Sequence, residues 1–592
     1  MANSATKISA LGTFILAIIV IISNLAWAGS GASNSTSKLS PELVSVPKGK
    51  LVNIIVQYRT LTQHEFAQAQ TMAKGAMPAK SLSLINSIAM TVESNSLATL
   101  ANDPNVLHVS VDHQVSATGL TTGGNPVVTD FYDQAVNAPS AWSLGLTGTG
   151  IGIAVIDSGV TNQGDFLASN GTSRIVYSAN YNNDSYTRAF GHGTHVAGIL
   201  AGDGANSTGP EYTKTFLGIA PNANVASFRV LDGLGLGTDS TVIAGIQAAV
   251  GLKSTYNIRV MNISLGRPVF ESYTVDPLCQ AVEAAWKAGI VVVVAAGNDG
   301  RDDSFNTYGY GTISAPGNDP YVITVGAMKP EGTATRTNDL IASYSSKGPT
   351  VVDHIVKPDL VAPGNLTIST LASTSALIYT LFPQDQVPMS YYETGGGSTS
   401  SPYYFTLSGT SMATPVVSGA AALLLQNNSA LTPDQVKARL MLSAYKTFPK
   451  SSRAVDPITG ISYTDYYDIF TVGAGYVDIE AALNNTVSAP STIGVAKSPS
   501  VGVDASGNVY MVTGSSVIWG SSVVWGTSVV WGGSVVATNE SGESVLNAIG
   551  ATSVVWGTST DAGYSVVWGT SAPTSSLAAT ADAATVTYFG EK

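Results

Sequence analysis

Cysteine is almost absent from this 592-residue sequence, which contains only Cys279, so no disulfide can form within the chain. Cys279 lies in DPLCQAVEAAWKAG, where the apolar residues have helical spacing. A lone cysteine in such a pattern is more often a buried structural thiol than a nucleophile. The sequence therefore predicts that Cys279 packs in the interior and takes no part in catalysis.

Charged residues are also scarce, because Asp, Glu, Lys and Arg make up 11 % of the chain, against about 25 % in an average soluble domain. The formal net charge is −12, and neither basic nor acidic residues gather in a run. A protein without basic clusters is a poor binder of nucleic acid. We therefore expect no nucleic-acid partner and attribute the acidic balance to solubility.

Long apolar runs are lacking after the N-terminus, so no later segment is expected to span a membrane. Residues 10–22 form the one apolar run, which follows a lysine and precedes the small residues Ala26 and Ala28. This run is shorter than the ~20 residues that span a bilayer. Residues 1–28 are therefore predicted to be a signal peptide of a secreted protein, free or associated with the cell surface. An uncleaved membrane anchor is the alternative.

The chain is too long for one hydrophobic core and divides into segments of different composition. Residues 29–43 are a polar spacer. Residues 44–117 contain two strand patterns, LVNIIVQYR and NVLHVSVD, with helical spacing between them in SLINSIAMTVESNSLATLA. These residues are predicted to form a small α+β unit, which a polar linker, residues 118–129, separates from the rest.

Residues 130–487 alternate short apolar strands with helical patterns, as in IGIAVID, RVMNISL and IVVVVAAGN. Strands that are apolar on both faces indicate an α/β fold, a parallel β-sheet sandwiched by helices. Functional sites in such sheets lie at the carboxyl ends of the strands. This rule points to Asp157, Ser264 and Asn298, which follow or end three of the predicted strands.

Residues 488–592 carry a repeat of the SVVWG type, in which Trp519, Trp525 and Trp531 are six residues apart. The glycine after each tryptophan favours one bend per unit, as in a β-solenoid. The segment is therefore predicted to be a β-rich tail. It is either a small appendage that packs its own indole rings or the functional part of an adhesin or self-association module.

Histidine is scarce too, and of six in the chain only three lie in the α/β segment. His192 and His195 occur in GHGTHVAGIL, three residues apart and without glutamate between them. A zinc peptidase helix carries two histidines four residues apart with a glutamate between them. We therefore expect no catalytic metal, and consider the histidines as general bases, for which the usual pKa of imidazole is suited.

A serine hydroxyl becomes a nucleophile only when a base takes its proton, and that base needs an acceptor on its other nitrogen. Ser411 precedes a long apolar helical pattern in SGTSMATP, and Asp157 ends the strand IGIAVID. Each alone is consistent with a helix cap or a turn. Together with a histidine at a helix start, they would converge on one edge of the sheet.

Three motifs, AVIDSGV, GHGTHVAG and GTSMATP, occur in this order, together with NISLG, VVVVAAGND, SYSSKGP and KPDLVAPG. In these motifs the chain resembles the subtilisin-like serine peptidases, the subtilases. The resemblance implies that Asp157, His192 and Ser411 form a triad that hydrolyses protein and peptide substrates through an acyl-enzyme, with no cofactor for catalysis. A binding protein on the same fold is the alternative, because a fold alone does not prove activity.

The resemblance also implies a substrate site. Asn298 would donate from its amide to the oxyanion, together with the backbone N–H of Ser411. An extended peptide would pair with the backbone of Ser264, Leu265 and Gly266. This segment and a second one, Ala295, Ala296 and Gly297, would form the walls of the primary specificity pocket.

Two nearby segments leave alternatives open. The acidic loop with Asp299, Asp302 and Asp303 either favours a basic substrate side chain or is simply solvated. The segment MSYYETGGGSTSSPYYFTL, close in sequence to Ser411, is either a lid over the site or a structural insertion.

The α+β unit, residues 44–117, resembles the inhibitor-type propeptide of subtilases. It would block the cleft of its own catalytic domain until the chain is cut within residues 118–129. Many subtilases also hold structural calcium. Asp165 falls about where one calcium ligand of the family lies, whereas the loop at 202–216 departs from the family in length and residues, which leaves calcium open.

Overall fold

A computed structural model describes residues 38–118, 131–503, 508–512 and 566–567, without residue 76 and the short segments 183, 185–187, 304–306, 457–459 and 487–490. The predicted signal peptide, most of the predicted linker and the tryptophans of the repeats lie outside the described residues. Within the described part of the chain, none of the helices has the length and apolar character to cross a membrane.

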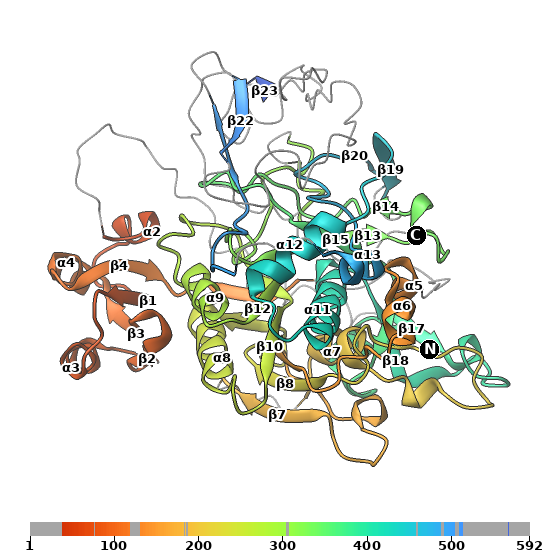
Figure 1. Ribbon diagram of the computed structural model, residues 1–592. Coiled ribbons are helices and arrows are strands. Elements are labelled where there is room, and N and C mark those ends of the chain that lie inside the picture. The colour runs from red at the N-terminus through yellow and green to blue at the C-terminus, as the bar shows by residue number, and fades with distance from the viewer. Residues whose placement is uncertain are drawn as a thin grey trace, which may run out of the picture.

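A central sheet of eight strands, shown in Figure 1, forms the frame of the larger domain. The order is β14-β13-β12-β10-β6-β8-β7, with β15 beside β13, and only the β13–β14 pair is antiparallel. The strands are β6 (Gly152–Asp157), β7 (Ile175–Asn180), β8 (Asn224–Arg229), β10 (Ile258–Ile263), β12 (Val291–Ala295), β13 (Ile323–Lys329), β14 (Leu340–Ile341) and β15 (Leu360–Pro363). The predicted parallel sheet is confirmed.

Helices cover both faces of this sheet. On one face α8 (Asp239–Gly251) packs beside α9 (Pro277–Lys287), and on the other α7 (His192–Ala201) packs beside α11 (Thr410–Asn427). Every residue of β6 and β12 is buried, as expected for strands that lie between two helical layers. Other helices of the domain are α5 (Tyr132–Ala135), α6 (Ala138–Ser143), α12 (Pro433–Ser443) and α13 (Ile479–Asn484).

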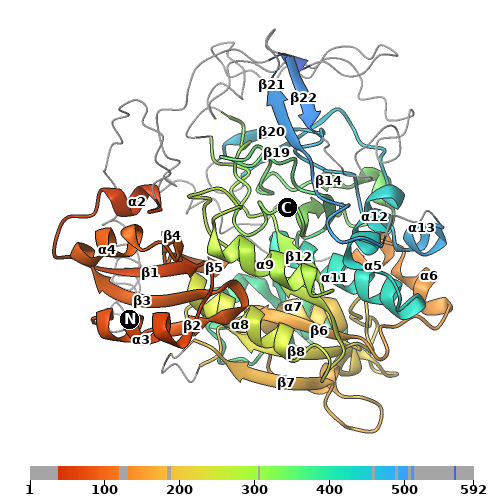
Figure 2. The same cartoon turned by 60° about the vertical axis from the view of Figure 1, so that its left-hand side comes forward.

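The N-terminal unit has a sheet and an apolar core of its own, and it lies beside α8 and α9 in both Figure 1 and Figure 2. The sheet order is β2-β3-β1-β4. Its elements are α2 (Pro41–Val44), β1 (Leu51–Tyr58), α3 (Gln63–Met72), β2 (Lys80–Leu82), β3 (Ser87–Glu93), α4 (Leu97–Asn102) and β4 (Val106–Val111).

One local prediction in this unit was wrong. The stretch expected to be helical between the two strand patterns contains β3, and apart from two single 3-10 turns only α4 at its end is helical. β3 pairs with β1 on one side and with β2 on the other. Its sequence SIAMTVE contains three β-branched residues, and two neighbouring strands satisfy its backbone, so tertiary pairing outweighs the weak helical spacing.

The segment between β15 and α11 forms a small subdomain. It contains β16 (Thr367–Thr370), α10 (Leu377–Leu381), β17 (Gln386–Pro388) and β18 (Ser400–Leu407), with the three strands in the order β16-β18-β17. Phe216 from the loop after α7 packs against Tyr392 and Tyr404 to form an aromatic core.

The C-terminal part returns to the larger domain. β19 (Ser451–Val455) pairs with β20 (Ser462–Tyr466), and β21 (Ser500–Val503), β22 (Asn508–Val512) and β23 (Val566–Val567) form a three-stranded sheet. Before β21, the backbone N–H of Ala496 donates to the Asp434 carboxylate at the start of α12. The chain at 496–501 therefore packs against the larger domain.

Candidate active site

Asp157 and His192 meet at the carboxyl edge of the sheet. Asp157 is the last residue of β6 and His192 the first of α7. Nδ1 of His192 lies 2.9 Å from Oδ1 and 3.0 Å from Oδ2 of Asp157, and both side chains are fully buried. A methyl group on Gly193 would lie 2.6 Å from the carbonyl oxygen of Gly159, so this close approach requires glycine.

Ser411 is the second residue of α11, where the partial positive charge of the helix N-terminus is concentrated. Its hydroxyl donates to the Ser264 carbonyl at 3.0 Å and lies 2.8 Å from Oγ1 of Thr118. The Ser264 hydroxyl in turn donates to the Ser411 carbonyl at 3.1 Å. Ser264 follows β10, the strand next to β6, so Ser411 belongs to the same edge as Asp157.

The direct contact predicted between the imidazole of His192 and the hydroxyl of Ser411 is not formed. Within the described residues Nε2 of His192 is buried without a hydrogen-bond partner. The Ser411 hydroxyl is instead engaged by Ser264 and by Thr118, which directly follows residues 44–117 of the predicted N-terminal unit. The structure therefore brings Asp157 to His192, and it leaves Ser411 bonded to a segment that the sequence placed at the start of the linker.

Asn298 follows β12 and is 5 % exposed. Its Oδ1 accepts from the backbone N–H of Thr410 at 2.9 Å and from the Thr410 hydroxyl at 3.1 Å. A backbone N–H can only donate, so this bond determines which side of the amide is the oxygen. In the described part of the chain the Asn298 NH₂ group has no partner. A buried donor without a partner indicates a binding role.

An extended segment that follows β4 lies beside Ser411, between two strands of the larger domain. β5 (Gln114–Ala117) is the middle strand of an antiparallel sheet, between β11 (Leu265–Gly266) and β9 (Leu236–Thr238). The N–H of Thr118, next along the chain, donates to the Ser264 carbonyl at 3.3 Å. The segment Ser264–Leu265–Gly266 thus pairs with an extended peptide in the way that β-augmentation requires.

The strand on the opposite side of β5 was missed in the sequence. The N–H of Ala117 donates to the Gly235 carbonyl at 3.1 Å, and β9 follows Gly235 directly. The only local signal is the run GLGLG after a predicted strand. Glycine-rich runs usually indicate turns, so spacing alone does not distinguish this edge strand from a loop.

The Ala295–Ala296–Gly297 segment forms a second wall at the end of β12, where Ser314 lies against it. The N–H of Ser314 donates to the Ala296 carbonyl at 2.9 Å. A methyl group on Gly297 would lie 2.5 Å from Ser314 Oγ. One on Gly266 would lie 3.0 Å from Ser314 Cβ and 3.6 Å from Cγ2 of Thr118. Ser314 therefore lies close to both Gly297 and Gly266, one residue in each of the two segments.

Two residues singled out in the sequence are structural. His195 lies within 3.0 Å of the Phe405 carbonyl, and burial, followed by the nearby His192, lowers the pKa of His195 to about 3. The Cys279 thiol is buried and donates to Asn318 Oδ1, which confirms its predicted role, and burial raises its pKa well above the usual value. No cluster of three metal-ligating side chains occurs in the described residues.

The insertion before Ser411 supports the turn that leads into α7. The N–H groups of Leu377 and Ile378 in α10 donate to the carbonyls of Ala189 and Phe190 at 3.0 and 3.2 Å. A methyl group on Gly191 would lie 2.9 Å from Ile378 Cδ1. These contacts belong to α10, which precedes the segment MSYYETGGGSTSSPYYFTL. That segment itself packs Tyr392 and Tyr404 on Phe216, which favours a structural insertion over a lid.

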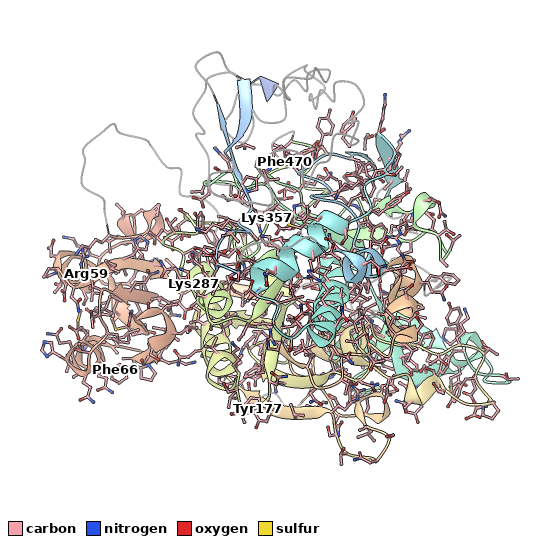
Figure 3. All side chains as sticks on the ribbon, viewed as in Figure 1. Arg59, Phe66, Tyr177, Lys287, Lys357 and Phe470 are labelled. Atoms are coloured by element: carbon pink, nitrogen blue, oxygen red, sulfur yellow. The ribbon has the colours of Figure 1, made fainter. Side chains whose placement is uncertain are left out.

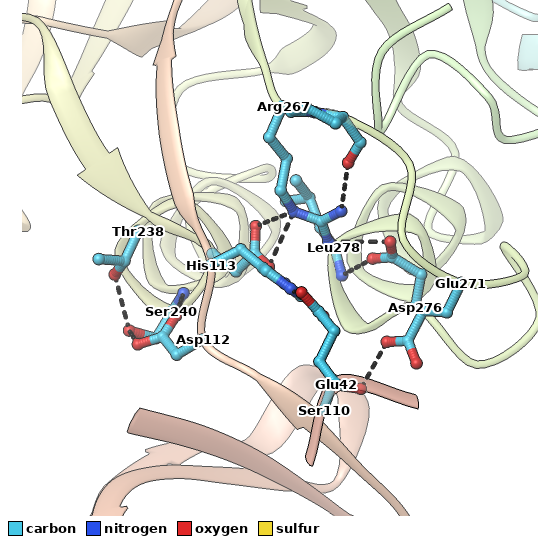
Figure 4. A network of polar contacts seen from close by, with 12 residues as sticks. Glu42, Ser110, Asp112, His113, Thr238, Ser240, Arg267, Glu271, Asp276 and Leu278 are labelled. Carbon is cyan, nitrogen blue, oxygen red and sulfur yellow. Dashed lines mark hydrogen bonds and ion pairs between the residues drawn. The ribbon is translucent and has the colours of Figure 1, made fainter. Parts of the chain in front are cut away.

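A polar network, buried except for Glu42, joins the N-terminal unit to the larger domain (Figure 4). Nε2 of His113 lies 2.7 Å from the Glu42 carboxylate, and its Nδ1 lies 3.5 Å from that of Asp239. The His113 ring stacks on Phe270 with 4.2 Å between centroids. Arg267 donates to Asp239 at 2.9 Å, so the two carboxylates and the guanidinium all face this imidazole.

Peptide-bond hydrolysis is the chemistry that this edge of the sheet accommodates, because a peptide, a hydroxyl and a bonded imidazole–carboxylate pair gather there. The class of protein is therefore a serine peptidase built on a parallel α/β sheet. Comparison with known proteins agrees: the profile of the Subtilase family matches residues 148–466, more than half of the chain. The chain belongs to the subtilase family and is a subtilisin-like serine endopeptidase.

The relatives of the chain are peptidases of this family. Serine protease AprX of Bacillus subtilis is 40 % identical over 307 residues, which are 50 % of this chain and 61 % of AprX. Subtilisin E of the same organism is 32 % identical over 63 % of this chain and 78 % of its own length. Fervidolysin from Fervidobacterium pennivorans, a keratinolytic enzyme related to subtilisin, shares the fold with a TM-score of 0.53 at 22 % identity, over 76 % of this chain and 62 % of fervidolysin.

Proposed function

We propose that the protein is a secreted serine endopeptidase made as a zymogen, with Asp157, His192 and Ser411 as its catalytic triad. The observation that carries the proposal is the extended segment ending at Thr118, which lies against the Ser411 hydroxyl as a substrate would. Casein hydrolysis by the purified protein, and its loss in the Ser411→Ala variant, test this function.

In the proposed reaction Ser411 turns from the Ser264 carbonyl to Nε2 of His192, which has no other partner in the described residues. The serine oxygen attacks the scissile carbonyl while the imidazole takes its proton. Asp157 holds the imidazole in one tautomer and stabilises its charged form. The imidazolium then gives the proton to the leaving amine, and water releases the acyl group by the same steps.

The oxyanion of the tetrahedral intermediate needs donors that are in position before the reaction. We assign these to the NH₂ group of Asn298 and the backbone N–H of Ser411. Thr410 supports the assignment because its N–H group fixes the Asn298 oxygen and leaves the NH₂ group as the free end.

The N-terminal unit would act as an intramolecular inhibitor that leaves its last strand beside Ser411 after cleavage. This role is supported by two kinds of contact with the larger domain. β5 lies between β9 and β11, and Gln57 in β1 donates from its side chain to the Val275 carbonyl at 2.6 Å.

The bond after Thr118 is predicted to be the one cut during maturation. The N–H of Thr118 bonds to Ser264 and its hydroxyl to Ser411, so the carbonyl of Thr118 is the next group along the chain. Mass spectrometry of the secreted protein should give a mature chain that begins at Gly119, or a shortened form of it. A cut on the N-terminal side of Thr118 would contradict this assignment.

A matched pair of variants tests the pocket at the same bond. Thr118→Tyr should slow self-cleavage by about 10-fold or more, because one mismatched group in a substrate pocket is worth 1–3 kcal/mol. Ser314→Gly in the same chain should restore much of the rate, since Ser314 lies against Gly297 and Gly266 in the two segments. The rate is measured as loss of full-length chain on a gel, and failure of Ser314→Gly to restore it would reject this pocket.

Release of the cut N-terminal unit is predicted to depend on pH. Burial lowers the pKa of His113, and the positive charge of Arg267 acts in the same direction. The carboxylates of Asp239 and Glu42 outweigh both effects and raise the pKa of His113 to about 9. Because the pKa of His113 is raised in the complex, protonation of His113 stabilises the bound state. This stabilisation is complete below the free pKa of about 6.5 and is lost as the pH rises through about 9. The buried Asp112, with a pKa raised to about 6 by burial and by Asp239, acts in the same direction at lower pH.

Size-exclusion chromatography of the self-cleaved protein should therefore show the complex at pH 6 and increasing dissociation toward pH 10. His113→Gln should remove most of this change above pH 7. His64→Gln is the matched control, because His64 is exposed on α3 and contacts only Gln68 of the same helix through its ring. Dissociation that increases toward acid pH would contradict the assigned sign.

A further inference from the structure

The region where the family resemblance leaves room for calcium is filled by an arginine. The buried guanidinium of Arg174 donates to the carbonyls of Ala201, Ala223 and Asp165 at 2.8, 2.9 and 2.6 Å. It also lies 3.5 Å from the Asp203 carboxylate. Backbone carbonyls and carboxylates are the ligands that calcium uses, and here they surround a side-chain cation.

The carboxylate of Asp165 is engaged as well. It accepts from the N–H of Asn206 and from the Tyr404 hydroxyl, each at 2.8 Å. Burial raises its pKa to about 6, although these two hydrogen bonds oppose the rise. Calcium requires six to eight oxygen ligands. The residues around Asp165 therefore do not fit a calcium site, because Arg174 already occupies the oxygen atoms that would form it.

A second internal cation has the same kind of surroundings. The ammonium group of Lys437 in α12 is fully buried among five oxygen atoms. They are the carbonyls of Pro320 (3.0 Å), Tyr321 (3.2 Å) and Val322 (2.9 Å), the hydroxyl of Ser498 (3.0 Å) and a carboxylate oxygen of Asp359 (3.2 Å). A lysine has only three N–H donors, so this oxygen cage offers more acceptors than the ammonium can satisfy by hydrogen bonding.

The cage is closed by residues far apart in the chain. Lys357, labelled in Figure 3, donates to the other carboxylate oxygen of Asp359 at 2.7 Å and to the Val322 carbonyl at 3.0 Å. Ser498 donates to Asp359 at 2.5 Å and comes from the C-terminal segment before β21. The cage thus joins α12, β15, the segment before β13 and the C-terminal part of the domain.

We propose that Arg174 and Lys437 are built-in cations that replace bound metal ions, so that the folded domain does not depend on calcium. It follows that the Lys437 cage becomes a cation site when the ammonium group alone is removed. Lys437→Met makes this change, because methionine keeps most of the side-chain stem and leaves an opening at the position of Nζ.

The test uses the full chain with Ser411→Ala, in which self-digestion cannot confuse the readout, and follows the apparent midpoint of thermal unfolding at a fixed scan rate. With Lys437 present, the midpoint should change by less than about 1 °C between excess EDTA and millimolar CaCl₂. Lys437→Met should lower the midpoint by about 5–10 °C in choline chloride, because it leaves buried acceptors unpaired. KCl or CaCl₂ at the same ionic strength should restore at least half of that loss.

Lys446→Met is the matched control, because the Lys446 ammonium donates to only two carbonyls, those of Met441 and Ala474. Its midpoint should fall without recovery in KCl or CaCl₂. A midpoint that drops in EDTA while Lys437 is present would overturn the proposal, as would equal recovery of the two methionine variants or recovery of neither. If Lys437→Met does not fold, the EDTA comparison on the chain with Lys437 still decides.

Discussion

Replacement of Ser411 by alanine is expected to lower kcat for a peptide substrate by about 10⁴- to 10⁶-fold, a magnitude known from subtilisin, a relative of this chain. Without the hydroxyl no acyl-enzyme can form, and water must attack the substrate directly. The oxyanion donors remain, so a small residual rate above that of water is expected. Hydrolysis of a chromogenic peptide measures the loss, and intact mass spectrometry should show that the N-terminal unit remains attached.

Ser408→Ala is the matched control for this variant. Ser408 lies three residues earlier, and its hydroxyl accepts from the N–H of Leu366 at 2.9 Å, at the end of the pairing between β16 and β18. We expect a rate within about threefold of the parent, because an ordinary hydrogen bond of this kind contributes about 1 kcal/mol to stability. If Ser411→Ala kept the parent rate, the assignment of the nucleophile would be wrong.

Replacement of Asn298 by aspartate is expected to lower kcat by about 10²- to 10³-fold with little change in KM, again by analogy with subtilisin. Aspartate keeps the shape of the side chain and the acceptor for Thr410 but replaces the NH₂ group with an oxygen that repels the developing oxyanion. An interaction made only in the transition state affects kcat and leaves KM nearly unchanged. Steady-state kinetics on the peptide substrate separate the two constants.

Asn222→Asp is the control for the added charge. Asn222 is exposed and donates from its side chain to the Thr147 hydroxyl at 3.0 Å, on a loop before β8. Its kinetic constants should equal those of the parent, since exposed charges are screened by solvent. A rise in KM with unchanged kcat in Asn298→Asp would place Asn298 in substrate binding and not at the oxyanion.

The N-terminal unit shows where local patterns are insufficient. Strands β1 and β4 were predicted correctly, because LVNIIVQYR is rich in strong β-formers and NVLHVSVD alternates apolar and polar residues. The stretch SIAMTVE satisfied a helical spacing equally well, and its conformation was decided by pairing with β1 and β2. β2 directly precedes β3 along the chain, but β1 ends at Tyr58, so no short window contains the pairing with β1.

The sequence by itself determined the parallel sheet, the positions of Asp157, His192, Asn298 and Ser411 at its carboxyl edge, and the family. Apolar periodicity and short motifs are local, and the geometry of parallel strands brings their ends together. Only the tertiary structure decided that Thr118 engages the Ser411 hydroxyl, that Ser314 lies against Gly297 and Gly266, and that Arg174 and Lys437 lie in oxygen cages. These contacts join residues far apart in sequence, and their distances follow from the packing of whole elements against one another.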